Sequence, residues 1–112
     1  MKNEFCIMPD YPPYFRNFRF EGSERHEVFE GRTGNRQKSI EDGLVIFTTP
    51  EIHRTNKNSI HLAPKEWEWI KEIAEKRWCE FYNKSIKDFI NRYGRNYLWH
   101  FMTHIDIELF IC

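Results

Sequence analysis

The sequence predicts an α+β fold in which two short strands and a helical turn come first and two further helices follow. Residues 44–48 (LVIFT) are apolar or β-branched and follow an Asp-Gly pair, which is typical of a strand. Residues 64–82 repeat apolar side chains at three- and four-residue steps, which is typical of a helix. Residues 103–111 alternate apolar and polar side chains, which indicates a half-buried strand at the C-terminus.

The size and composition indicate a single domain without a membrane segment. The chain has 112 residues, 17% of them aromatic, so a few large rings can supply much of a modest core. Its 17 basic and 17 acidic residues cancel, which argues against binding nucleic acid through bulk charge and leaves only local phosphate contacts. Three widely spaced cysteines and the lack of a signal-like or membrane-spanning apolar run predict a cytoplasmic protein with reduced thiols.

Residues 1–24 form a distinct N-terminal arm. Pro9, Pro12 and Pro13 exclude a helix interior and favour an extended chain. The aromatic side chains between and after them are Tyr11, Tyr14, Phe15, Phe18 and Phe20. Two interpretations remain open: the arm packs over the core, or its rings form a platform for nucleobases or for a partner peptide.

The first half of the chain after the arm reads as strand, loop, strand and helical turn. Residues 25–29 predict a short strand, and Gly31, Gly34 and Asn35 predict a loop after it. The strand at 44–48 leads at once into Thr49, Pro50 and Glu51. An N-cap threonine, a proline at the first helical position and an acid in the first turn predict a helix start, which places His53 in its opening turn.

The second half is expected to be mainly helical. In the helix over 64–82, the expected apolar face consists of Trp67, Ile70, Ala74, Trp78 and Phe81, and the charged residues expected mostly outside it are Glu68, Lys71, Glu72, Glu75 and Lys76. A shorter helix begins at Ser85, which forms a capping box with Asp88, and ends at Gly94. The extension at 99–112 is expected to be an edge strand that pairs within the fold or with a second copy of the chain.

Histidine, carboxylate and amide side chains gather in the first half in an order that suits metal chemistry. His26 and Glu27 are in the first strand, Asn35 in the loop, His53 in the helical turn, and His61 follows a short polar link. These side chains can ligate a divalent ion, and histidine or glutamate can act as a general base. Two antiparallel strands with a helix across them would bring the segments together around a scissile phosphate.

These residues resemble the short HNH-fold (ββα-metal) proteins of bacteriophages and prophages. The matching segments are residues 25–31 (RHEVFEG), 35–40 (NRQKSI), 43–45 (GLV), 50–53 (PEIH), 59–61 (SIH), 88–90 (DFI) and 93–98 (YGRNYL). The resemblance implies an HNH-like ββα unit at 25–63, with 64–98 as the helical part of the same domain. It also implies a bacterial host cell as the location.

The resemblance further implies roles for individual residues. His26 and Glu27 occupy the paired positions of a metal ligand and the general base, and either His26 or Glu27 can be the base that activates water. Asn35 occupies the position of the asparagine that orients the base, and His53 that of the second metal ligand. His61 matches a further histidine without an assigned role. Arg36 and Lys38 are candidates for phosphate contacts. The implied cofactor is a divalent ion, Mg²⁺ or Mn²⁺.

The zinc-ligand positions depart from the pattern of this family. The first pair is reduced to Cys6, with Pro9 in place of a second cysteine, and the second pair is replaced by Thr49 and Ile52. One thiolate cannot build a tetrahedral site, so the structural zinc is expected to be lost, with packing of the aromatic arm in its place.

Two functions follow as hypotheses. The first is a phage-type, metal-dependent HNH-like nuclease that hydrolyses phosphodiester bonds of nucleic acid. The second is a non-catalytic protein of the same fold that binds and inhibits a host defence protein, such as a CRISPR nuclease. Zero net charge, the lost zinc ligands and the added aromatic and β-rich ends favour the second hypothesis.

Overall fold

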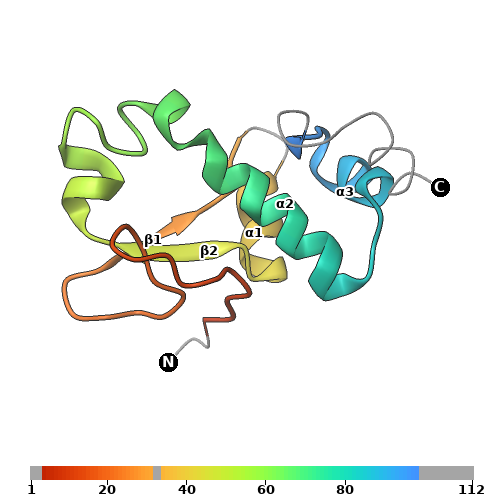
Figure 1. The fold of residues 1–112 in the computed structure, drawn as a ribbon, viewed down its shortest axis with the longest axis horizontal. Helices are drawn as coiled ribbons and strands as arrows, with labels where there is room; N and C mark the ends of the chain where they lie inside the picture. The colour runs from red at the N-terminus through yellow and green to blue at the C-terminus, as the bar shows by residue number, and fades with distance from the viewer. Residues whose placement is uncertain (1–3, 32–33, 99–112) are drawn as a thin grey trace.

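The fold is α+β, as the sequence predicts, and is built around a small antiparallel sheet (Figure 1). A computed structural model describes residues 4–31 and 34–98. In chain order the elements are β1 (Glu24–Glu27), α1 (Asn35–Asp42), β2 (Val45–Thr48), the π-helical turn η1 (Glu51–Thr55), the 3₁₀ turn η2 (Pro64–Trp67), α2 (Glu68–Tyr82) and α3 (Ile86–Tyr93). The strand expected at 103–111, and its pairing with a second copy, lie outside the described residues. Within the described ranges, no helix has the length and apolar character needed to cross a membrane.

The side chains of β1 lie alternately on the two faces of the two-stranded sheet. His26 lies across from Ile46, and Glu24 lies across from Thr48. Because side chains alternate along a strand, Glu24 and His26 share one face of the sheet, and Arg25 and Glu27 share the other. This alternation decides which carboxylate can reach the histidines.

The expectation of a loop around Asn35 is wrong, because Asn35 is the first residue of α1. Gly34 adopts a left-handed conformation and directs the chain into the helix, and Gly43 ends it in the same way. Inside the helix, the Ser39 hydroxyl donates to the carbonyl of Phe29 and accepts from its N–H. These two bonds fasten α1 to the end of β1, a tertiary contact that the local glycine pattern does not reveal.

The N-terminal arm packs on the sheet, in agreement with the first of its two interpretations. Arg16 and Phe47 exchange backbone hydrogen bonds of 2.8 and 2.9 Å, so the arm lines the edge of β2 away from β1 (Figure 1). The Cys6 thiol donates to the carbonyl of Val45, and burial raises the pKa of this thiol, which keeps it protonated. The arm residues buried in the core are Ile7, Met8 and Phe15.

Three helices meet at Asp42, a buried carboxylate at the end of α1. Its Oδ2 accepts from the Trp78 indole at 2.8 Å and the Tyr93 hydroxyl at 2.7 Å. Arg92 adds a two-pronged ion pair, with Nε 2.6 Å from Oδ2 and an Nη 2.9 Å from Oδ1. Asp42 therefore joins α1 to α2 through Trp78, and to α3 through Tyr93 and Arg92.

The capping and packing of α2 and α3 agree in part with the sequence. The predicted capping box of Ser85 with Asp88 is present, and Gly94 ends α3. Among the expected core residues of the long helix, Ile70, Ala74 and Trp78 are buried. Trp67 is half-buried and packs against the core, whereas Phe81 is 46% exposed, so the expected apolar face is wrong at Phe81. Phe81 instead lies beside Phe5 of the arm, at the surface.

The expectation that Glu72 and Glu75 lie outside the buried face is also wrong. Both are buried, at 6% and 0% exposure. Oε1 of Glu75 accepts from the backbone N–H of Tyr97 at 2.6 Å, whereas its Oε2 has no hydrogen-bond partner among the described residues. A backbone N–H of the segment after α3 therefore bonds to a carboxylate on α2. Helical periodicity alone cannot indicate that this carboxylate is buried. Burial raises the pKa of Glu75 to about 7.

Replacing Glu75 by glutamine is expected to remove a pH dependence of stability. The folded protein keeps a proton on Glu75 from pH 4.5 to about 7, and the unfolded chain releases it. Stability therefore falls as pH rises through this window, by up to about 1.4 kcal/mol per pH unit. Urea unfolding of Glu75→Gln at several pH values should show a flatter profile and a gain above pH 7. Exposed Glu80→Gln on the same helix is the control, and equal profiles for the two variants would contradict the prediction.

Candidate metal centre

Three histidines from three separate segments meet at one end of the sheet. The potential ligand atoms of His26, His53 and His61 all lie within 4.8 Å of one another. The Nε2 atoms of His53 and His61 are 2.9 Å apart, and the His26 ring lies 5.3 Å from each of the other two, centroid to centroid. The structure thus brings together both predicted metal ligands and the further histidine.

Short-range structure explains how these rings come together. His26 points from β1 into the protein. Only two residues separate the end of β2 from the start of η1, which puts His53 beside the strand pair. The chain then turns back on η1: Ile60 N–H donates to the Ile52 carbonyl at 2.8 Å and His61 N–H to the His53 carbonyl at 3.1 Å. These backbone bonds hold the His61 ring next to His53.

Carboxylates support two of the three rings from behind. His53 Nδ1 donates to Glu24 Oε1 at 2.8 Å, which leaves its Nε2 lone pair directed at His61. His61 Nδ1 lies 3.7 Å from Glu30 Oε1, which is close enough for an electrostatic contact but too long for a hydrogen bond. Metal-binding histidines usually pass their second nitrogen to a carboxylate in this way, because that bond fixes the tautomer and the ring orientation.

The third ring has an orphaned atom. His26 is 5% exposed, and its Nδ1 has no hydrogen-bond partner among the described residues. Buried polar atoms are rarely left unpaired, so this nitrogen needs an explanation. Burial, with His53 and His61 adding to it, lowers the pKa of His26 to about 3, and burial also lowers the pKa of His61. Both rings are therefore neutral at pH 7, which is the form that can ligate a metal.

The surroundings are open to solvent on one side and carry two exposed arginines. His26 and His53 are buried, but the side chain of His61 is 32% exposed. Arg54 Nε lies 3.3 Å from Glu24 Oε1, and an Nη of Arg36 lies 3.9 Å from Glu30 Oε2. Their side chains are 60% and 65% exposed, so both guanidinium groups can meet an anion that approaches the histidines.

The other predicted site residues have different partners. The carboxylate of Glu27 pairs with Arg25 at 2.9 Å and with Arg36 at 3.3 Å, on the sheet face opposite to His26. The Asn35 amide donates to the Tyr93 carbonyl at 3.1 Å. Lys38 Nζ donates to the Arg92 carbonyl at 2.8 Å. Of the two expected phosphate contacts, only Arg36 lies beside the histidine cluster.

Sequence reasoning missed Glu24, Glu30 and Arg54. Glu24 could have been found, because it stands two residues before His26 and strand alternation puts both on one face. Arg54 follows His53 directly in the helical turn, which is a weaker signal. The contact of Glu30 with His61 depends on how two loops fold, and the sequence holds no local sign of it.

Comparisons with protein-family models, with curated proteins and with solved structures found no match for this chain. The geometry of the described residues therefore supplies the evidence for the function of this chain.

Proposed function

We propose that this protein is a metal-dependent phosphodiesterase that acts on nucleic acid, with β1, β2 and η1 as an HNH-like ββα-metal unit. The observation that supports this most strongly is the convergence of His26, His53 and His61, with Glu24 bonded behind His53. The unpaired Nδ1 of buried His26 fits a missing partner at the same place. A structural histidine cluster would be expected to satisfy that atom with a hydrogen bond.

The donor set favours a transition-metal ion over the Mg²⁺ that the family resemblance implies. Three imidazole nitrogens suit Zn²⁺ or Ni²⁺, and Mg²⁺ prefers oxygen ligands and its own water. Mn²⁺ lies between these groups in affinity for nitrogen donors. When bound, such an ion would activate a water and stabilise the charge that develops on a phosphoryl group.

The chain's own residues have complementary tasks in this proposal. Glu24 holds His53 in the tautomer with a free Nε2, and burial keeps His26 neutral. Arg36 and Arg54 bind the phosphate, because a guanidinium can give two parallel hydrogen bonds to phosphate oxygens. Neither Glu27 nor Asn35 is given a role in the chemistry, since both have partners elsewhere.

The direct test combines metal titration with nicking of supercoiled plasmid. The chelator-stripped full chain should bind Zn²⁺ and Ni²⁺ more tightly than Mn²⁺, and Mg²⁺ least. Nicking should require one of the bound ions and stop when chelator is added. Arg54→Gln should slow nicking and leave metal affinity unchanged, because Arg54 is exposed and is not a ligand. Absence of metal uptake, or nicking that persists in chelator, would contradict the proposal.

A protein-binding role is the second candidate function. It is favoured by exposed aromatic side chains on the arm and on α2, namely Phe5, Tyr11, Tyr14 and Phe81. Large rings at a surface are typical of interaction sites. A host defence protein remains one proposed partner of this kind, and the role does not require the metal centre.

A further inference from the structure

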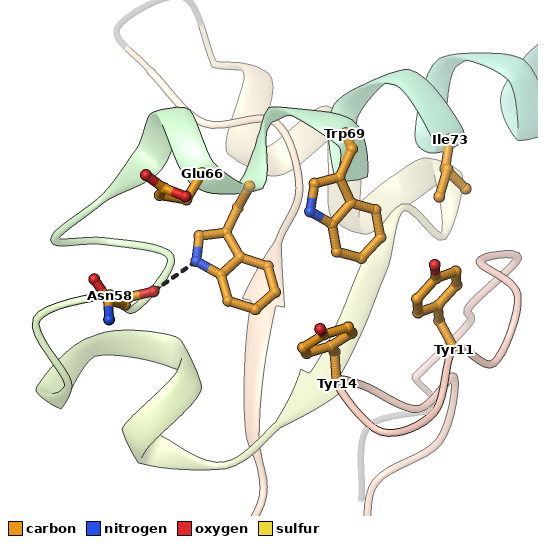
Figure 2. Close-up of a pocket in the computed structure, with 7 residues that line it drawn as sticks. Tyr11, Tyr14, Asn58, Glu66, Trp69 and Ile73 are labelled. Atoms are coloured by element: carbon orange, nitrogen blue, oxygen red, sulfur yellow. Dashed lines mark hydrogen bonds between the residues drawn. The ribbon is translucent and has the colours of Figure 1, made fainter.

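A second site lies between the N-terminal arm and the start of α2, where none of the three histidines takes part. Here a hollow of about 680 Å³ is lined by four aromatic rings, those of Tyr11, Tyr14, Trp67 and Trp69, with Glu66 at its edge. Figure 2 shows Trp69 extending from the helix toward Tyr11 and Tyr14 of the arm, with Glu66 farther along the same side. We propose that this hollow binds an arginine side chain of a partner protein.

The rings form a continuous platform. The indoles of Trp67 and Trp69 lie side by side, with centroids 5.8 Å apart and planes inclined by 34°. Tyr14 meets Trp67 edge-on at 5.4 Å, and Tyr11 lies 5.0 Å from Trp69. Both tyrosines are 41% exposed, so part of this platform is open to a ligand. A planar cation can stack on such rings, and tryptophan is the best partner for it.

The charges around the platform are not balanced by the chain itself. Five cation–π contacts occur elsewhere in the described part of the chain, on Phe47, Phe81, Tyr93 and twice on Tyr97, and none on these four rings. Glu66 is exposed, and no ion pair to it occurs within residues 4–31 and 34–98. Electron-rich ring faces and an uncompensated carboxylate together attract a cation.

An arginine fits this chemistry better than the alternatives. Its planar guanidinium can stack on an indole and give two parallel hydrogen bonds to a carboxylate, whereas lysine offers a more strongly hydrated point charge. A nucleic-acid strand would need basic residues along its backbone, and the lining of the hollow contains none. Glu66 would also repel a phosphate. The charge pattern therefore separates this site from the proposed phosphate site at Arg36 and Arg54.

The surroundings indicate a peptide as the source of the arginine. The hollow shares Tyr11 and Ile73 with a neighbouring one of about 640 Å³, which is lined in part by Phe5 and Phe81 and also carries Lys76, Arg77 and Glu80. Because its charges are mixed, the second hollow suits the apolar part of a bound segment, and the arginine belongs at Glu66. The exposed Phe5 and Phe81 in the second hollow suit apolar side chains of the same peptide.

The test uses a capped Gly-Arg-Gly-Arg-Gly peptide and its citrulline analogue, which has the same shape without the charge. In ¹⁵N spectra of the full chain, the indole signals of Trp67 and Trp69 should shift with the arginine peptide, and that of Trp78, bonded to Asp42, should not. Affinity should fall about fivefold or more for citrulline and for Glu66→Gln. Glu68→Gln, an exposed acid two residues away and outside the lining, is the matched control and should bind like wild type.

Three results would overturn the inference. One is that the arginine and citrulline peptides bind equally well, or that neither peptide shifts the indole signals. Another is that Glu66→Gln and Glu68→Gln lose equal affinity for the arginine peptide, which would show that only the net charge of the protein matters. The third is stronger shifts of the same indoles with a short oligothymidine than with the arginine peptide, which would identify a nucleobase platform instead. Because these readouts do not involve the histidines, failure here leaves the proposed phosphodiesterase untouched.

Discussion

Replacing His53 by alanine is expected to abolish metal binding and, with it, the proposed cleavage. His53 supplies a central nitrogen, 2.9 Å from the Nε2 of His61, and is fixed from behind by Glu24. Loss of an outer carboxylate partner alone costs about 10- to 100-fold in metal affinity, and loss of a ligand should cost more. Calorimetric titration with Zn²⁺ measures the effect. Thermal unfolding in chelator shows whether the variant still folds, and His53→Asn provides a polar substitute if alanine does not.

Two carboxylate variants test whether Glu24, which is bonded to His53, or Glu27, which the sequence indicates, belongs to the site. Glu24→Gln should weaken Zn²⁺ binding by about 10- to 100-fold, because it removes the charge behind His53. Glu27→Gln should stay within about twofold of wild type, since its carboxylate pairs with Arg25 and Arg36 and lies on the sheet face opposite to His26. A larger effect of Glu27→Gln than of Glu24→Gln on metal binding or nicking would restore Glu27 to the site and contradict the arrangement described here.

Replacing Asp42 by alanine is expected to cause the largest loss of stability. The change leaves the Trp78 indole and the Tyr93 hydroxyl without an acceptor, and it leaves Arg92 without its two-pronged partner. Breaking a buried charge network from one side costs about 3–5 kcal/mol, which is a large share of the about 5–15 kcal/mol that holds a domain folded. Urea unfolding monitored by tryptophan fluorescence measures this loss.

Two milder variants keep the prediction testable if Asp42→Ala does not fold. Tyr93→Phe removes a single hydrogen bond to Asp42 and should cost about 1 kcal/mol. Glu41→Ala removes the neighbouring acid, whose side chain is 55% exposed and lies 3.2 Å from the same arginine. Because exposed ion pairs contribute about 0–1 kcal/mol, Glu41→Ala should be nearly neutral. Comparable losses in Glu41→Ala and Asp42→Ala would show that the burial of Asp42 is unimportant.

The two strands, the helical turn, α2 and α3 follow from local chemistry. Residues 44–48 are apolar enough to be buried on both faces, and Pro50 and Ser85 start helical segments because their backbone geometry and hydroxyl suit those positions. The partners of the metal centre were predicted less well. His26 and His53 lie near one another, as predicted. The carboxylate bonded behind His53 is that of Glu24, which shares a strand face with His26, whereas Glu27 lies on the other face.

What the sequence by itself determined is the order of the two strands, the helical turn, α2 and α3, and the identity of the histidines that converge. These depend on propensity, caps and the spacing of residues along one segment. Tertiary structure alone decided that Asn35 begins a helix held by Phe29, that Glu75 is buried against the N–H of Tyr97, and that Phe81 lies at the surface beside Phe5. Each of these depends on a hydrogen bond or a ring contact with a residue that is distant in the chain. Such a contact leaves no period or motif in the residues around it, and so it can be found only once the chain is folded.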